Sequence, residues 1–277
     1  MEKQPSPVKR IRLAPISSKD SAKLVKALHY SGRSPQNSQL HLGVFLDGRC
    51  GGVIALGPSI DKRRMANLVE GSDRNDFLEI NRMALAEWMP RNSESRVIAM
   101  AIRYLKKHHP RIKWIVSFAD GTQCGDGTIY RAAGFLLTSI KRNSTMLRMP
   151  DGSIVSDKAL NNGICAGGRS GRAVAIEQGA APLPGFQLRY VKFLDPSWRP
   201  RLKVPVLPFS AIDEAGARLY RGEKPAKGKR AESIKADAPA IQAGEGGSIP
   251  TSALHSPLAS SHGPAARSAG DSAGGPA

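Results

Sequence analysis

The hydrophobic pattern of the first half of the chain alternates between helical and strand-like segments. The segment AKLVKALHY has apolar residues three and four positions apart, which predicts a helix that ends at His29 and Tyr30. Two apolar runs then meet at Asp47-Gly48, a dipeptide typical of a tight β-hairpin turn. These patterns predict a helix followed by a pair of antiparallel strands.

A strand–helix–strand pattern follows the hairpin. FLEINRMALAEW, from Phe77, predicts a central strand, and SESRVIAMAIRYLKKHH predicts a helix with one apolar stripe, ended by Pro110. KWIVSFAD is short and apolar, as in a buried strand, and a short helix ended by Gly134 leads into further strands. This order predicts an α/β (α+β) fold, with a mixed sheet flanked by helices and a right-handed crossover at its centre.

Composition divides the chain into four segments. Residues 1–10 are polar and expected to be flexible, and residues 11–150 form the predicted core. Residues 151–220 are expected to form a basic extension packed on the core, with irregular peripheral structure at residues 167–173 and in the proline-rich segment 195–209. The segment 221–277 is rich in Ala, Gly, Ser and Pro and has no Phe, Tyr or Trp, so a disordered tail is expected.

The protein is strongly basic. Its 277 residues include 41 Lys and Arg against 23 Asp and Glu, a formal net charge of +18. The segment 221–277 contributes little to this excess, which therefore belongs to the predicted folded part. A field of this size attracts polyanions, and nucleic acid is the first candidate partner.

Cysteine usage and hydropathy indicate a reducing compartment. The three Cys residues lie far apart and match neither a zinc module nor a disulfide framework. No apolar run has the length of a signal peptide or of a membrane span. We therefore expect a cytoplasmic protein without a membrane partner.

The segment EWMPRNSESR places a helix start directly after the central strand. Its backbone N–H groups, polar side chains and arginines are expected to cap the helix and to bind an anion such as a pyrophosphate. An ordinary helix cap is the alternative. The residues predicted to bind a cofactor here are Arg91, Asn92, Ser93, Ser95 and Arg96.

Several sequence blocks in a fixed order carry a resemblance to a known family. The blocks are Lys26-x-x-His29-Tyr30, Ile80-Asn81-Arg82, Pro90 to Arg96, Ser117-Phe118-Ala119-Asp120, Gly127 to Phe135 and Arg189 to Leu194. With them, about residues 11–212 resemble the Mom-type DNA modification proteins of Mu-like phages. The YxxxGF pattern at Tyr130 also looks like the end of the Gcn5-related N-acetyltransferase fold. Where that fold carries a glycine-rich loop, this chain has RNSESR, without glycine.

The resemblance implies an unusual chemistry on DNA. It implies an acetyltransferase-like core that converts adenine to N6-carbamoylmethyladenine in double-stranded DNA, in the cytoplasm of a bacterial host, and so protects phage DNA from restriction. It further implies a donor derived from acetyl-CoA, with Fe2+ as a second cofactor. Two alternatives stay open: a conventional acetyl-CoA-dependent N-acyltransferase acting on a small amine or a protein, and a noncatalytic DNA-binding protein. A homodimer is compatible with each, because the sequence leaves the oligomeric state open.

Six residues are candidates for catalysis: His29, Tyr30, Arg82, Ser117, Asp120 and Tyr130. The carboxyl ends of strands line the ligand crevice of an open α/β sheet, so several of these residues are expected to converge there. The imidazole, phenol and carboxylate of His29, Tyr30 and Asp120 offer N and O donors compatible with non-haem iron. The resemblance places Tyr130 beside the thioester of the donor, as a general acid.

Each candidate also has a structural alternative. His29 is favoured at a helix carboxyl end, and Asp120 suits a turn. Ser117 is an ordinary strand hydroxyl and Tyr130 a core aromatic in this interpretation. Arg82 is expected to contact a phosphate or carboxylate, or else to pair with Glu79 or Glu87.

Four basic stretches are candidates for holding DNA phosphates. They are residues 62–64, 141–142, 169–172 and 199–203. Trp198, next to the last stretch, is expected either to stack on a base or to pack against the core. An enzyme that acts on adenine in duplex DNA must hold the backbone while the base leaves the stack.

Overall fold

The computed structural model describes residues 6–120, 125–143, 145–156, 160, 170–183, 185–217 and 241. Its elements in chain order are η1 (Pro7–Arg10), β1 (Ile11–Pro15), α1 (Ser18–Leu28), β2 (Leu40–Leu46), β3 (Arg49–Gly57), α2 (Lys62–Ala66), β4 (Phe77–Leu85), α3 (Ser93–His108), β5 (Trp114–Asp120), α4 (Thr128–Ala132), β6 (Leu136–Asn143), β7 (Met146–Arg148), β8 (Ile154–Ser156), α6 (Gly171–Glu177), β9 (Ala181–Pro182), β10 (Gly185–Phe193), η2 (Pro196–Arg201) and α7 (Ser210–Glu214).

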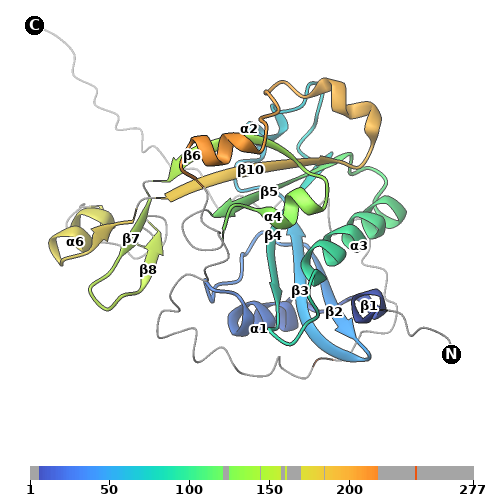
Figure 1. Ribbon diagram of the computed structural model, residues 1–277, viewed down its shortest axis with the longest axis horizontal. Coiled ribbons are helices and arrows are strands. Elements are labelled where there is room, and N and C mark those ends of the chain that lie inside the picture. The colour runs from blue at the N-terminus through green and yellow to red at the C-terminus, as the bar shows by residue number, and fades with distance from the viewer. Residues whose placement is uncertain are drawn as a thin grey trace, which may run out of the picture.

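A seven-stranded mixed sheet forms the centre of the protein (Figure 1). Its strand order is β1-β2-β3-β4-β5-β10-β6, and every neighbouring pair is antiparallel except β4 and β5. The parallel pair is joined through α3, as expected for a strand–helix–strand unit. The α/β fold with a mixed sheet flanked by helices is confirmed.

The β2–β3 hairpin forms where the sequence predicts it. Asp47 and Gly48 connect the two strands with φ angles of 51° and 83°. Positive φ at both central positions is the geometry of the tight turn whose twist matches antiparallel strands, and Asp and Gly tolerate it best.

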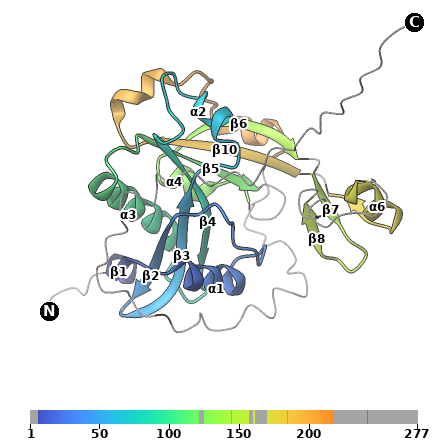
Figure 2. The same ribbon diagram turned by 180° about the vertical axis from the view of Figure 1, so that it is seen from behind.

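Helices cover both faces of the sheet (Figure 2). Successive side chains of β5 point to opposite faces: Ile115 packs with α3 and α4, while Trp114 and Val116 pack with α2. We call these sides the α3 face and the α2 face. On the α2 face, α1 covers β3 and β4 in a separate cluster that includes Leu24 and Val53.

Strands β4 and β5 part after only three register pairs. Their pairing runs from Phe77–Trp114 to Glu79–Val116, although β4 continues to Leu85 and β5 to Asp120. Figure 1 shows β5, β10 and β6 turned across the direction of β1 to β4. The sheet therefore contains an internal seam between residues 80–85 and 117–120, where neither strand pairs with the other.

Strand β10 extends one expectation about the second half of the chain. Residues 185–193 form a nine-residue strand between β5 and β6, inside the main sheet. The predicted extension, residues 151–220, therefore contributes a strand to the main sheet, in addition to packing on the core. Leu188, Tyr190 and Val191 are at most 1% exposed, so β10 belongs to the core.

The remaining described residues lie outside the main sheet. A three-stranded sheet, β8-β7-β9, packs with α6 around Leu147 and Ala175, and both views place it at one end of the protein. The predicted tail lies outside the described residues, apart from Ile241, which is buried beside the α1 cluster. In the described part of the chain no helix is both long and apolar enough to cross a membrane.

Candidate active site

His29 follows the last residue of α1 and lies next to two other predicted site residues. Its ring contacts that of Tyr30, with centroids 4.1 Å apart. The charge of Arg82, on β4, acts on the same imidazole. The structure thus brings three of the six catalytic candidates together on the α2 face.

The hydrogen bonds of His29 define its protonation state. The backbone N–H of Ser31 donates to Nδ1 at 3.1 Å, and the Ser31 hydroxyl lies 2.8 Å from the same nitrogen. Nδ1 therefore acts as an acceptor, which leaves the proton of the neutral ring on Nε2. Burial, followed by the nearby charge of Arg82, lowers the pKa of His29 to about 3. At neutral pH His29 is a hydrogen-bond donor through Nε2.

The depressed pKa of His29 predicts acid sensitivity of the fold. Below the ordinary pKa of 6.5 the unfolded chain binds a proton at this residue while the folded protein does not, so stability falls as pH falls. Between pH 7 and pH 5 the loss should be about 2 kcal/mol. Urea unfolding of wild type and His29→Gln at several pH values measures it. An identical pH dependence in both proteins would contradict the assignment.

Arg82 is held by backbone oxygens. Its Nη1 donates to the carbonyl of Asn81 at 2.8 Å, and its Nε to that of Arg33 at 3.4 Å. The predicted alternative, an ion pair with Glu79 or Glu87, is wrong: within the described residues Arg82 forms no ion pair. Its positive charge therefore stays available to a phosphate or carboxylate.

Ser117 and Tyr130 lie on the other side of the sheet. Ser117 pairs in register with Tyr190 of β10, and the Tyr190 ring lies 5.3 Å from that of Tyr130. The Tyr190 hydroxyl donates to the backbone carbonyl of Asp126, which fixes the approach to α4. Tyr130 is 8% exposed and also contacts Phe135, so it is a core aromatic; its role as a general acid stays a prediction.

Ser117 is the most unusual polar group at the seam. Its side chain is fully buried, and within the described residues the hydroxyl has no hydrogen-bond partner. It directly follows Val116, the last β5 residue paired with β4. A buried hydroxyl without a partner costs stability, and this one keeps its donor and acceptor capacity for a group bound at the seam.

Asp120 ends β5 and faces the side opposite to Ser117. Successive residues of a strand point to alternate faces, so Asp120 shares the α2 face with Phe118 and Val116. Its carboxylate is partly exposed. The six candidates are therefore divided between the two faces of the sheet, with His29, Tyr30, Arg82 and Asp120 on one side.

The start of α3 differs from the predicted helix cap. Asn92 has a left-handed conformation, with φ 67°, and makes no side-chain capping bond. The hydroxyls of Ser93 and Ser95 donate to the carbonyls of Pro90 and Asn92, at 2.5 and 3.2 Å. Side-chain capping is therefore wrong here. The Ser93 N–H donates to the Pro90 carbonyl at 3.2 Å, so within the described residues the N–H groups of Glu94 and Ser95 are the ones left for another acceptor.

Arg96 adds a second donor beside the start of α3. Its Nε is buried and has no hydrogen-bond partner in the part of the chain that the structure describes. An orphaned guanidinium N–H next to helix N–H groups suits a phosphate. Arg91 and Asn92 are exposed at the same helix start. Of the five predicted cofactor-binding residues, Ser93 donates both its N–H and its hydroxyl to the Pro90 carbonyl, whereas Ser95 keeps its backbone N–H for a ligand.

The predicted iron ligands do not fit a metal site. A ligating histidine normally donates its second ring N–H to an acceptor, yet the Ser31 N–H points at Nδ1 of His29. Binding a metal through Nε2 would place two hydrogens against each other there. In the part of the chain that the structure describes, no three His, Cys, Asp or Glu side chains gather in a way that could hold a metal ion.

Sequence reasoning missed two residues that shape this region. Tyr190 anchors the segment before α4, and Gly127, with φ 78°, lies so close that an added Cβ would be 2.5 Å from the Tyr190 ring. Tyr190 lies within one of the family-like blocks, but only its burial in β10 reveals its role. Gly127 could have been recognised in the sequence by its position directly before the helix TIYRA.

Comparison with known proteins finds a family match over most of the folded chain. The model of the Mom protein family matches residues 10–211. Methylcarbamoylase mom of Escherichia phage Mu is 34% identical over 196 residues, which cover 70% of this chain and 80% of the relative.

Solved structures with some likeness include acetyltransferases. An IAA acetyltransferase from Bacillus cereus is 14% identical with a TM-score of 0.38, and covers 66% of this chain and 99% of its own. A spermidine/spermine N-acetyltransferase from Vibrio cholerae is 9% identical with a TM-score of 0.40, covering 68% and 95%.

Proposed function

The chain belongs to the Mom protein family, and from this premise we propose that it transfers a carbamoylmethyl group to N6 of adenine in double-stranded phage DNA. The observation that carries the proposal is the 34% identity to the phage Mu methylcarbamoylase across 80% of that relative. A transferase-type enzyme of phage DNA modification is the general class. The adenine target, the transferred group and its donor are the specific content of the proposal.

An acyl-CoA-derived donor is proposed to bind at the start of α3. The N–H groups of Glu94 and Ser95, together with the Arg96 Nε, are the proposed cradle for its pyrophosphate, because within the described residues none of the three has an acceptor. Arg91, exposed at the same helix start, adds a positive charge. When bound, this group would supply the two-carbon unit of the substituent and release CoA thiol, while the amide nitrogen would come from an amine co-substrate and, for an acetyl donor, the new N–CH2 bond would need a two-electron oxidant.

Ser117 is proposed to orient the transferred group. Its hydroxyl lies at the seam, buried and without a partner, so it is free to donate to a carbonyl oxygen placed there. A donor fixed in a dry site stabilises developing negative charge without having to reorganise. The backbone edges that β4 and β5 leave unpaired provide further groups for an extended donor chain.

The adenine is proposed to approach the seam from the α2 face, so that it meets the transferred group, held by Ser117 on the other side, between the unpaired parts of β4 and β5. A base in duplex DNA reaches an active site only after leaving the stack. Arg82 offers a positive charge, and the Nε2 proton of His29 a hydrogen-bond donor, on this face. Tyr30 is 40% exposed, so its ring is accessible to stack on an extruded base.

Nucleoside mass spectrometry of plasmid DNA tests this function. DNA from bacterial cells that express the protein should contain a deoxyadenosine heavier by C2H3NO, and cells with an empty vector should lack it. A deoxyadenosine heavier by C2H2O would instead indicate plain acetyl transfer. Unmodified DNA from cells that contain folded protein would refute the proposal, and would favour an acyltransferase with another acceptor or a noncatalytic DNA-binding protein.

A further inference from the structure

Two basic stretches that lie far apart in the sequence form one surface. The segment around α2 and the segment around η2 are joined by backbone hydrogen bonds from Glu70 N to Arg201 O, 2.8 Å, and from Lys203 N to Leu68 O, 2.9 Å. Val69 and Leu202 form a β-bridge between them. We call this joined pair, residues 61–70 and 196–203, the α2–η2 surface.

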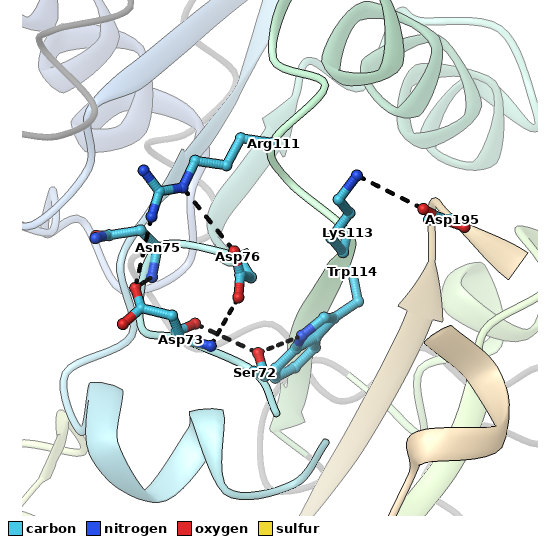
Figure 3. A network of polar contacts seen from close by, with 8 residues as sticks. All are labelled: Ser72, Asp73, Asn75, Asp76, Arg111, Lys113, Trp114 and Asp195. Carbon is cyan, nitrogen blue, oxygen red and sulfur yellow. Dashed lines mark hydrogen bonds and ion pairs between the residues drawn. The ribbon is translucent and has the colours of Figure 1, made fainter. Parts of the chain in front are cut away.

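A polar network holds the base of this surface in place (Figure 3). The Trp114 indole donates to Ser72 Oγ at 3.0 Å, and the ring stacks on Phe77 with centroids 4.3 Å apart. Arg111 lies 3.9 Å from both Asp73 and Asp76. Lys113 lies 3.6 Å from Asp195, directly before η2. The start of β5 therefore ties the loop after α2 to the segment that begins η2.

This network also separates the charges. Asp73, Asp76 and Asp195 are paired with cations at the base. The α2–η2 surface itself carries six cations against two carboxylates, Asp61 and Glu70. The six cations, none of which forms an ion pair within the described residues, are Lys62, Arg63, Arg64, Arg199, Arg201 and Lys203. Five of them are exposed, so their charges face solvent.

Trp198 contributes to the support of the surface. It packs against the apolar cluster under α2, and the guanidinium of Arg201 lies 4.8 Å from its ring centroid. The ring therefore contacts both the apolar cluster and a cation. Packing, the second of the two predicted roles for Trp198, is the one that the structure supports.

The surface adjoins the α2 face of the candidate site. Arg64 lies close enough to Arg189 of β10 for its charge, after burial, to lower the pKa of that guanidinium. Arg189 pairs in register with Phe118, two residues before Asp120. The row of cations thus extends from η2 through α2 towards the carboxyl end of β5.

We propose that the α2–η2 surface binds the phosphate backbone of duplex DNA and positions it so that an adenine reaches the α2 face. This inference rests on the proposed DNA function and adds the docking site. These exposed cations form no ion pairs within the described residues, so each can contact a phosphate of the duplex. Each such contact releases condensed counterions, which favours binding. Of the other predicted DNA-contacting stretches, residues 141–142 lie on β6, outside this surface, and 169–172 are only partly described.

Salt-dependent DNA binding tests the inference. The variant Arg63→Ala/Arg199→Ala/Lys203→Ala removes three exposed cations whose side chains form no ion pair within the described residues. The matched control, Arg103→Ala/Lys106→Ala/Lys107→Ala, removes three exposed cations from α3 on the other face. Fluorescence anisotropy with a labelled duplex yields the slope of log K against log salt concentration. The first variant should lose about 0.9 of slope per lost contact and at least about tenfold in affinity, while the control keeps the wild-type values.

The outcomes separate this surface from the catalytic proposal. Equal slopes for the two variants would overturn the docking site even if the DNA becomes modified. Tighter binding of an RNA duplex of equal length would also overturn it, in favour of RNA. A reduced slope in the first variant alone supports the docking site, and does so even if wild type leaves adenine unmodified. Both variants should melt at the wild-type temperature, because the altered side chains are exposed.

Discussion

A Ser117→Ala variant should be at least as stable as wild type and yet lose about 100-fold or more in DNA modification. The Ser117 hydroxyl is buried without a partner, so its removal relieves a desolvation penalty of about 1 kcal/mol. The same hydroxyl is the proposed donor to the transferred group, and removing one such donor slows related reactions strongly. Thermal unfolding and the amount of modified deoxyadenosine per cell measure the two effects.

Ser21→Ala provides the matched control for this prediction. Ser21 is also fully buried, but its hydroxyl lies 2.9 Å from Nδ1 of the buried His41. Its removal leaves that nitrogen without this partner, and should lower stability by about 1–2 kcal/mol. Opposite signs for the two serines are expected. A Ser117→Ala variant that is destabilised like Ser21→Ala, or one that keeps full activity, would contradict the role assigned to Ser117.

A Gly127→Ala variant should lose about 3 kcal/mol of stability, since left-handed strain and overpacking add. Gly127 has φ 78°, and a Cβ there would lie 2.5 Å from Cε2 of Tyr190, a side chain that is 1% exposed and cannot move freely. The displaced ring would also disturb Tyr130 and the register partner Ser117. Urea unfolding measures the stability, and nucleoside analysis the activity.

Gly125→Ala separates strain from overpacking. Gly125 also has a positive φ, 102°, but an added Cβ there meets no atom within 4 Å. The Gly125→Ala substitution should lower stability only through the strain of a left-handed backbone, by about 1–2 kcal/mol. If both variants lost the same free energy of unfolding, the close approach of Gly127 to Tyr190 would not contribute to the destabilisation.

Local sequence signals predicted the individual helices, strands and turns, whereas contacts between distant residues determine the order of the strands in the sheet. The Asp47-Gly48 turn and the apolar stripe of α3 depend on neighbours in sequence, and both appear as expected. Strand β10 pairs with β5 and β6, each more than forty residues earlier at the paired positions, and no local pattern of residues 185–193 specifies those partners. The position of a strand in a sheet is set by such distant contacts.

The candidate site was predicted residue by residue, but its arrangement was not. Ser117 and Asp120 are three positions apart on one strand, so alternation alone places them on opposite faces. The role of His29 changed because of one turn, in which the Ser31 N–H meets Nδ1. The geometry of a turn after a helix depends on its dihedral angles, which residue types specify weakly.

The place of β10 also orders events during synthesis. β6 is complete at Asn143, and β5 at Asp120, but the strand that lies between them ends only at Phe193. Until then a nascent chain presents two strand edges with unpaired N–H and C=O groups, the arrangement that pairs with other chains. Host factors that shield newly made polypeptides therefore have a defined interval in which to act, from the emergence of β5 to that of β10.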